Sequence, residues 1–168
     1  MRIVNTPVSN EEINKLHIGD MMSISGYIFC GRDAVLPKVV DLIKQGKEDK
    51  IDLSLKGGIV FHTAVSSAGI GPTSSNKLEI ESSIEPLSKA GIKIHLGKGA
   101  ITPETVQALN NNNAVYAVVP PVTALLSANI LEKKCIAFPE LGMEALYLIK
   151  MKEFQALIAA AHGESIYD

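Results

Sequence analysis

The chain of 168 residues contains no long hydrophobic run, little excess charge of either sign and only two cysteines. A membrane-spanning helix needs a run of about 18 or more apolar residues, so the sequence encodes none. The formal net charge is −2, and no long block of like charges attracts nucleic acid or an anionic lipid surface. We therefore expect no nucleic-acid partner and no membrane partner.

The two cysteines, Cys30 and Cys135, lie far apart, and neither belongs to a CxxC pair or has a histidine at ligand spacing. An iron–sulfur cluster uses roughly three or four thiolates, so the sequence predicts no metal site in this chain. The start, Met1–Pro7, lacks the apolar core of a secretory signal, which makes the reducing cytoplasm the expected location. A cation at Arg32 could activate Cys30, but a small buried apolar residue is the favoured interpretation.

Short apolar segments alternate with stretches of helical periodicity, which is typical of an α/β domain with a partly parallel sheet. We expect one domain over residues 1–168. The predicted strands are 21–29, 58–63, 92–96, 114–119, 135–138 and 146–150. The predicted helices begin near residues 10, 34, 78, 103 and 122, and the last of them covers 122–130. The stretch 154–161 suits either a frayed helix or one arm of a terminal hairpin.

Several polar residues and prolines mark where these helices begin. Ser9 opens a capping box, Asp33 is a candidate cap for the helix over 34–45, and Thr102 precedes a proline at a first helical position. Pro86 falls inside the helix that ends near residue 90, where it predicts a kink or a break.

Three glycine-containing segments each follow a predicted strand and precede a predicted helix: Gly31-Arg32-Asp33, Gly69–Lys77 and Gly97-Lys98-Gly99. Such junctions are where open α/β sheets bind ligands, and glycine lets the backbone approach an anion. The junctions carry three cations and three neighbouring hydroxyls, namely Arg32, Lys77, Lys98, Thr73, Ser74 and Ser75. Together they predict a binding half-site for a substrate with two carboxylates.

Structural interpretations of the same residues remain open. Arg32 and Asp33 could be an ion pair at a helix start, the hydroxyls could be caps, and Lys98 could lie in an ordinary exposed turn. A Walker A loop is excluded because Ile92 stands where the motif needs glycine and no hydroxyl residue follows Lys98. The four histidines show no ligand spacing and receive no functional role.

Four motifs occur in an order that resembles the β subunit of class I fumarate hydratases and L(+)-tartrate dehydratases. They are Gly31-Arg32-Asp33-Ala34, Gly71-Pro72-Thr73-Ser74-Ser75, Gly97-Lys98-Gly99 and Glu140-Leu141-Gly142-Met143-Glu144-Ala145. The resemblance covers nearly the whole chain. It implies a swivelling β/β/α domain, with a mixed sheet and flanking helices, that works with an α subunit carrying a 4Fe–4S cluster.

By this resemblance, Arg32, Lys77 and Lys98 bind substrate carboxylates, Ser74 and Ser75 add hydrogen bonds, and Thr73 stands where the family has a proposed catalytic base. The implied reaction is reversible hydration of a dicarboxylate, with fumarate to malate as the leading candidate. The chain itself holds no cofactor in this interpretation. Its expected partners are the cluster-bearing α subunit, in a hetero-oligomer, and a small dicarboxylate.

Two positions depart from the family pattern: Lys77 replaces an arginine, and Leu36 replaces a histidine. A lysine is a point charge and lacks the planar fork of arginine, so the substrate could differ in shape. Tartrate or another hydroxy-diacid is therefore an alternative substrate. A non-catalytic carboxylate-binding or assembly module is a second alternative, and a phosphate-binding enzyme that uses the Thr73 segment is a third.

Overall fold

The computed structural model describes residues 1–47, 54–66, 69–73, 77–119 and 129–167. Its helices are α1 (Asn10–Asn14), α2 (Leu36–Lys44), α3 (Lys77–Lys89), α4 (Pro103–Asn111) and the 3₁₀ segment η2 (Pro139–Glu144). Its strands are β1 (Arg2–Asn5), β2 (Met21–Cys30), β3 (Ile59–Phe61), β4 (Thr63–Ser66), β5 (Gly69–Thr73), β6 (Ile94–Gly97), β7 (Val115–Val118), β8 (Ile130–Ala137), β9 (Leu146–Ala161) and β10 (Glu164–Ser165).

Within the described residues, eight strands form one mixed sheet, and β4 and β5 form a separate hairpin. The strands β1, β2, β3, β6 and β7 run parallel to one another. The long strand β9 runs antiparallel and pairs with both β2 and β7, so the pairing closes on itself. The prediction of an α/β fold with a mixed sheet and flanking helices is confirmed.

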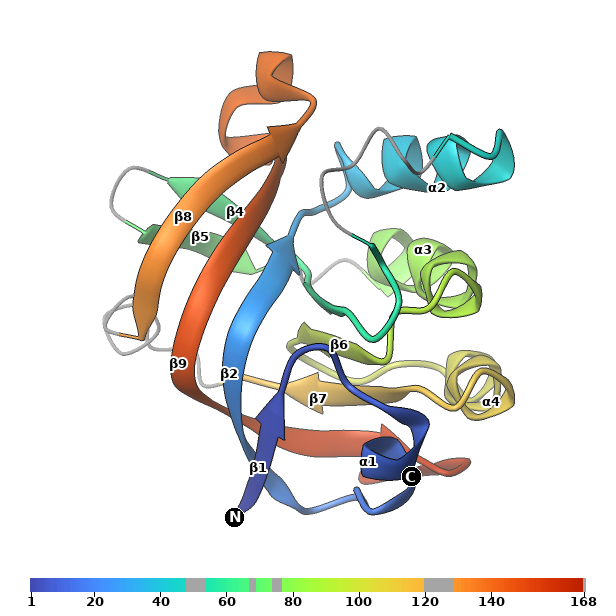
Figure 1. The fold of residues 1–168 in the computed structure, drawn as a ribbon. Coiled ribbons are helices and arrows are strands. Elements are labelled where there is room, and N and C mark those ends of the chain that lie inside the picture. The colour runs from blue at the N-terminus through green and yellow to red at the C-terminus, as the bar shows by residue number, and fades with distance from the viewer. Residues whose placement is uncertain (48–53, 67–68, 74–76, 120–128, 168) are drawn as a thin grey trace.

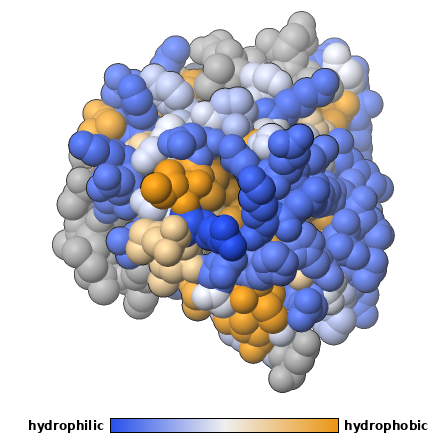
Figure 2. All heavy atoms as spheres, turned by 60° about the horizontal axis from the view of Figure 1, so that its bottom comes forward, coloured by the Kyte–Doolittle hydropathy of each residue, from blue (hydrophilic) through white to orange (hydrophobic). Residues whose placement is uncertain are grey.

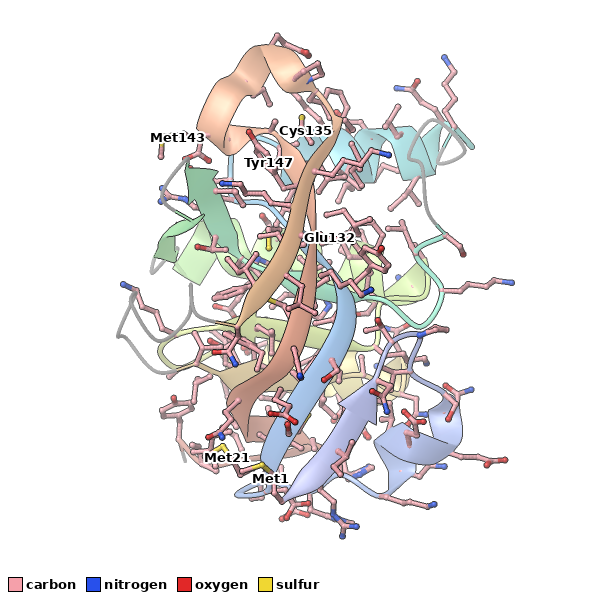
Figure 3. All side chains as sticks on the ribbon, turned by 60° about the vertical axis from the view of Figure 1, so that its left-hand side comes forward. Met1, Met21, Glu132, Cys135, Met143 and Tyr147 are labelled. Carbon is pink, nitrogen blue, oxygen red and sulfur yellow. The ribbon has the colours of Figure 1, made fainter. Side chains whose placement is uncertain are left out.

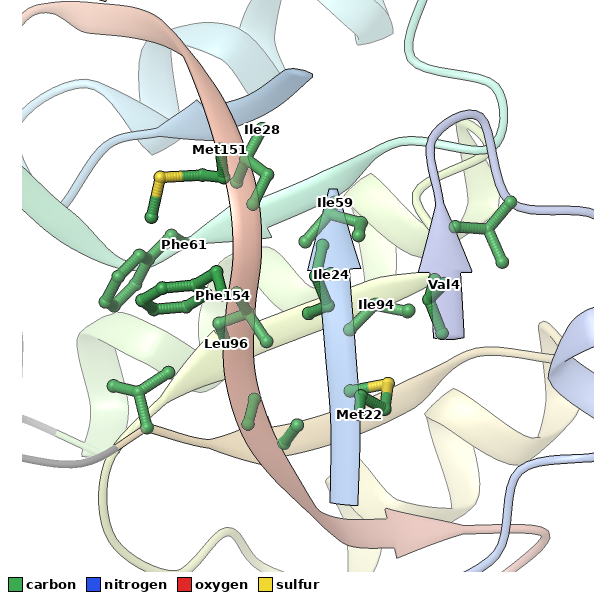
Figure 4. Packing of buried hydrophobic residues seen from close by; sticks show 14 of the residues in the cluster. Val4, Met22, Ile24, Ile28, Ile59, Phe61, Ile94, Leu96, Met151 and Phe154 are labelled. Carbon is green, nitrogen blue, oxygen red and sulfur yellow. The ribbon is translucent and has the colours of Figure 1, made fainter. Parts of the chain in front are cut away.

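The elements stack in three layers (Figure 1). The helices α2, α3 and α4 cover one face of the parallel strands, and β8 and β9 curve over the opposite face. The main core lies between the parallel strands and β9, where Phe61 and Phe154 meet with ring centroids 5.6 Å apart (Figure 4). A second cluster, which includes Val39 and Leu87, packs beneath α2 and α3. Burial on both faces explains why the parallel strands appear in the sequence as short continuous apolar runs.

Two of the three predicted helix caps are correct. The Ser9 hydroxyl accepts from the Glu12 N–H, and the Thr102 hydroxyl accepts from the Thr105 N–H ahead of α4. Asp33 is not a cap, because α2 begins only at Leu36 after an N-cap residue that makes no side-chain hydrogen bond. Pro86 does not break α3, which continues from Lys77 to Lys89.

The C-terminal third contains more strand than the sequence predicts. Residues 154–161 belong to β9, so of the two open alternatives the terminal hairpin, formed with β10, is correct. Its alanines are buried, since small side chains allow close packing where β9 bends from β2 to β7. The predicted helix over 122–130 falls mostly outside the described residues, and Ile130 begins β8.

The surface of the described residues is largely hydrophilic on the face that holds the two chain termini. Figure 2 shows separate small apolar patches there, and the exposed apolar side chains include Met1, Ile3 and Ile166. Scattered apolar residues of this kind are normal for protein surfaces. None of the helices in the described ranges is long and apolar enough to cross a membrane.

Candidate functional site

The carboxyl ends of β2, β3 and β6 lie level at one edge of the sheet. The Gly31 N–H donates to the Phe61 carbonyl over 3.1 Å, and the His62 N–H donates to the Leu96 carbonyl over 3.0 Å. Adjacent strands are about 4.8 Å apart, so the backbones that follow β2 and β6 are on the order of 10 Å apart. The segments that follow β2, β3 and β6 therefore meet in one region, which is the usual ligand site of an open α/β sheet.

Arg32 follows β2 at this edge, and its guanidinium lies between two carboxylates. Its Nε atom is 3.4 Å from Asp33 Oδ1 and 3.7 Å from Glu144 Oε1, with a quarter of the side chain exposed. The ion pair with Asp33 that the sequence left open is thus present. It is joined by a second carboxylate from η2, a segment more than a hundred residues further along the chain.

Thr73 reaches the same edge through the β4–β5 hairpin. The backbone of Thr73 pairs with Thr63, which comes two residues after the end of β3. The sequence placed Gly69–Lys77 as a junction between a strand and a helix, but Gly69–Thr73 is itself the strand β5, and its backbone is paired with β4. Ser74 and Ser75 lie outside the described residues.

Lys98 follows β6 in an exposed bend. Within the described ranges, no ion pair of Lys98 is recorded. The neighbouring Gly99 carbonyl accepts a 3.0 Å hydrogen bond from the Tyr116 hydroxyl, whose pKa is raised mainly by burial, so the hydroxyl stays a donor. Lys77 is the first residue of α3, and its side chain is outside the described part of the structure. The hydrogen bond from Tyr116 therefore holds the backbone next to Lys98, while Lys98 itself is exposed.

A carboxylate on α3 fixes the segment after Lys98. Glu81 Oε1 accepts from the Thr102 N–H at 2.7 Å, from the Thr102 hydroxyl at 2.6 Å and from the Thr105 hydroxyl at 2.5 Å. These groups form the first turn of α4, where a negative charge also interacts favourably with the helix dipole. Glu81 thus ties the start of α4 to α3 and limits the freedom of the bend that carries Lys98.

A chain of buried hydrogen bonds runs beneath this edge. His62 Nε2 is 3.1 Å from His95 Nδ1, and Ser88 Oγ is 2.9 Å from His95 Nε2. Burial lowers the pKa of His62 to about 4, and burial together with the charge that His62 would carry lowers the pKa of His95. Both rings are therefore neutral at pH 7. They connect the residue that follows β3 with β6 and α3.

Comparison with known proteins identifies the family. The model of the family described as "Fumarase C-terminus" matches residues 2–168. The chain therefore belongs to the fumarase C-terminal family. It is 26% identical to the L(+)-tartrate dehydratase β subunit of Escherichia coli K12 over 178 aligned positions, which cover 98% of this chain and 86% of that subunit.

Two further relatives show how the fumarase C-terminal region occurs in other proteins. A Methanocaldococcus jannaschii protein, provisionally named an L(+)-tartrate dehydratase β subunit, is 28% identical, with 96% of this chain and 88% of the relative covered. A Geobacillus stearothermophilus protein, provisionally named a class I fumarate hydratase, is 28% identical over 98% of this chain but only 33% of its own length. The same region is thus either a separate subunit or one part of a longer chain.

Metal ligands do not cluster in the part of this fumarase C-terminal chain that the structure describes. No group of three or more histidines, cysteines or acidic residues there could hold a metal ion. Cys30 and Cys135 both pair with Tyr147, one from each side of β9, so they are two strand spacings apart. Figure 3 labels Cys135 and Tyr147 of this group. Burial raises the pKa of Cys30, which matches the favoured interpretation as a buried apolar residue.

Two residues at this edge of the fumarase C-terminal fold were missed from the sequence. Glu144 belongs to a motif that carried the family resemblance, but nothing in its spacing indicated contact with Arg32. Thr63 was predicted only as the end of a strand, whereas it pairs with Thr73. The pairing of distant segments has no local sequence signal, and only covariation among relatives could have revealed these contacts.

Proposed function

We propose that this chain is the β subunit of a hydro-lyase that reversibly adds water to a dicarboxylate, with fumarate and malate as the leading pair. The observation that carries the proposal is the level edge of the sheet, where Arg32, the backbone of Thr73 and Lys98 are gathered. The names of the relatives, which are dehydratase and hydratase proteins, support the same reaction class.

In this proposal, Arg32 binds one carboxylate of the diacid and Lys98 binds the other. The two residues follow strands that are two spacings apart, and both side chains are long enough to reach inward to a four-carbon ligand. A diacid needs roughly two cations to offset the loss of its hydration. We assign Lys77 as a third cation and Ser74 and Ser75 as hydrogen-bonding groups.

Thr73 is assigned to the position of the catalytic base. A hydroxyl is a weak base, so a stronger proton acceptor must lie beside it when substrate is bound. The described part of this chain does not offer the ligand set of an iron–sulfur cluster, so we assign the cluster to a partner α subunit. When bound there, it would supply a Lewis acid for the substrate hydroxyl. This chain then contributes carboxylate binding and the base position.

Tartrate is the second candidate substrate. The β-subunit relatives from Escherichia coli and Methanocaldococcus jannaschii carry tartrate dehydratase names. The point charge of Lys77, where arginine is the family pattern, also suits a ligand that does not need a bidentate contact at that position. Fumarate and tartrate therefore have to be compared directly.

The test is an activity assay on the α–β complex. The chain should be co-expressed with its α subunit, purified without oxygen and assayed with fumarate, malate and tartrate. The complex should turn over at least one of them, and the isolated chain none. Lys98→Ala and Thr73→Ala should each lower kcat/KM by at least about tenfold. Lys15→Ala, which removes an exposed lysine at the end of α1, is the matched control and should behave like the parent.

The outcomes separate the alternatives. Full activity in both Lys98→Ala and Thr73→Ala would refute the site assignment. A complex that turns over no diacid, combined with saturable binding of malate or tartrate to the isolated chain in the micromolar range, would indicate a non-catalytic binding module. A catalytic half-site that lacks its partner should bind the same acids only weakly.

A further inference from the structure

Glu144 meets Arg32 at the edge of the sheet although the two residues come from opposite ends of the chain. Arg32 follows β2, whereas Glu144 ends η2, the connection between β8 and β9. Glu144 Oε1 is 3.7 Å from Arg32 Nε, the same nitrogen that lies 3.4 Å from Asp33 Oδ1. A guanidinium is planar, so two carboxylate oxygens beside Nε restrict the plane in which its terminal N–H groups point.

The backbone conformation of η2 places the Glu144 carboxylate next to Arg32. Phe138, before it, and Gly142, within it, have positive φ angles of 54° and 61°. The Gly142 carbonyl accepts hydrogen bonds from the Tyr147 hydroxyl and the Ala145 N–H, each over 3.1 Å. The segment also contacts β4, the partner strand of β5. Glu144 therefore stands on a fixed support between Arg32 and the β4–β5 hairpin.

The second oxygen of Glu144 adds no hydrogen bond to the fold among the described residues. The side chain is about one third exposed, yet its Oε2 atom is shielded from solvent and has no hydrogen-bond donor among the described residues. A buried acceptor without a donor costs about 1–3 kcal/mol. Residues that reduce stability at a ligand site are commonly retained for function.

We propose that Glu144 is a positioning residue, which holds the Arg32 guanidinium in the orientation that receives a substrate carboxylate. This role rests on the proposed function, since it presumes a diacid at the edge of the sheet. If Glu144 instead competed with the substrate for Arg32, Glu144→Gln would bind the substrate more tightly and KM would fall.

Kinetics of the α–β complex distinguish the two roles. Glu144→Gln removes the negative charge that lies 3.7 Å from Arg32 Nε, so KM should rise at least about fivefold while kcat stays within about threefold. Glu144→Asp, which keeps the charge on a shorter stem, should be intermediate. Glu140→Gln, from the same segment, is the matched control.

A second measurement does not depend on activity. In the isolated full chain, the Arg32 Nε–H resonance should shift and exchange faster with solvent in Glu144→Gln than in Glu140→Gln, and the melting temperature should not fall. An unchanged resonance or a lowered KM in Glu144→Gln would overturn the role of Glu144. A complex without hydro-lyase activity would instead overturn the proposed function, while the resonance still reports the ion pair.

Discussion

Acidification should destabilise this protein through its buried histidine pair before most carboxylates are protonated. His62 has its pKa lowered to about 4 by burial, whereas an unfolded chain binds the same proton with a pKa of about 6.5. The unfolded state therefore takes up the proton first, and this contribution to stability is present above about pH 6.5 and is lost as the pH falls toward 4. At pH 5 the loss from His62 alone is about 2 kcal/mol relative to pH 8.

His95 adds to the effect in the same direction. Its pKa is lowered by burial and by the neighbouring His62, and its two ring nitrogens face His62 and Ser88. A proton added to the ring that accepts across the 3.1 Å contact would leave two donors facing each other. The pair should therefore lose more stability than His62 alone would, and the loss should begin as the pH falls below about 6.5.

The assay is urea unfolding of the isolated chain between pH 8 and pH 5, compared with a variant that carries both His62→Gln and His95→Gln. The variant should be less stable at pH 8 but should lose at least about 2 kcal/mol less on acidification. The surface variant His17→Gln should keep the parental pH dependence. If the double variant does not fold, ring nitrogen shifts in the parent report protonation directly. Native His62 titrating near pH 6.5, or equal pH dependence in parent and variant, would refute the reasoning.

Three further predictions concern stability and reactivity. Gly26→Ala should lower the free energy of unfolding by at least about 2 kcal/mol, because the φ of Gly26 is +116° and a new Cβ would collide with the side chain that follows β1. The control Gly46→Ala should cost only about 1 kcal/mol, from backbone strain alone. Equal losses in the two variants would contradict this prediction. Glu81→Gln should cost about 2 kcal/mol and Glu85→Gln, in an exposed helix pair, under about 0.5 kcal/mol, as denaturant unfolding would show. A thiol reagent should label one cysteine in the native protein and two in denaturant, because Cys30 is buried; two fast thiols would refute its burial.

The helix starts and buried strands were predictable where the residues that stabilise them are neighbours in the sequence. Ser9 and Thr102 supply hydroxyls that accept from backbone N–H groups of their own helices, so no distant residue is needed. The short apolar runs of β3, β6 and β7 correspond to strands buried on both faces. The prediction failed at Asp33, whose carboxylate binds Arg32 and leaves the helix uncapped.

The predictions were wrong or incomplete for strands that are stabilised by pairing with distant segments. The segment Gly69–Thr73 shows no alternation of apolar and polar side chains, yet it is a strand because β4 offers a partner for its backbone. The alanines near the end of β9 favour a helix in isolation, but pairing with β2 and β7 and burial of their small side chains prevail. The segments that remain outside the described residues include Ser74 and Ser75.

The sequence by itself determined the α/β class, the family resemblance and the placement of Arg32 and Lys98 directly after strands, since these depend on periodicity, turn chemistry and order along the chain. Only the tertiary structure decided that Glu144 meets Arg32, that Thr73 pairs with Thr63 and that β9 closes the sheet. The physical reason is that local propensity acts over a few residues, whereas strand register and ion pairing between distant segments are set by burial and hydrogen bonding of the whole chain.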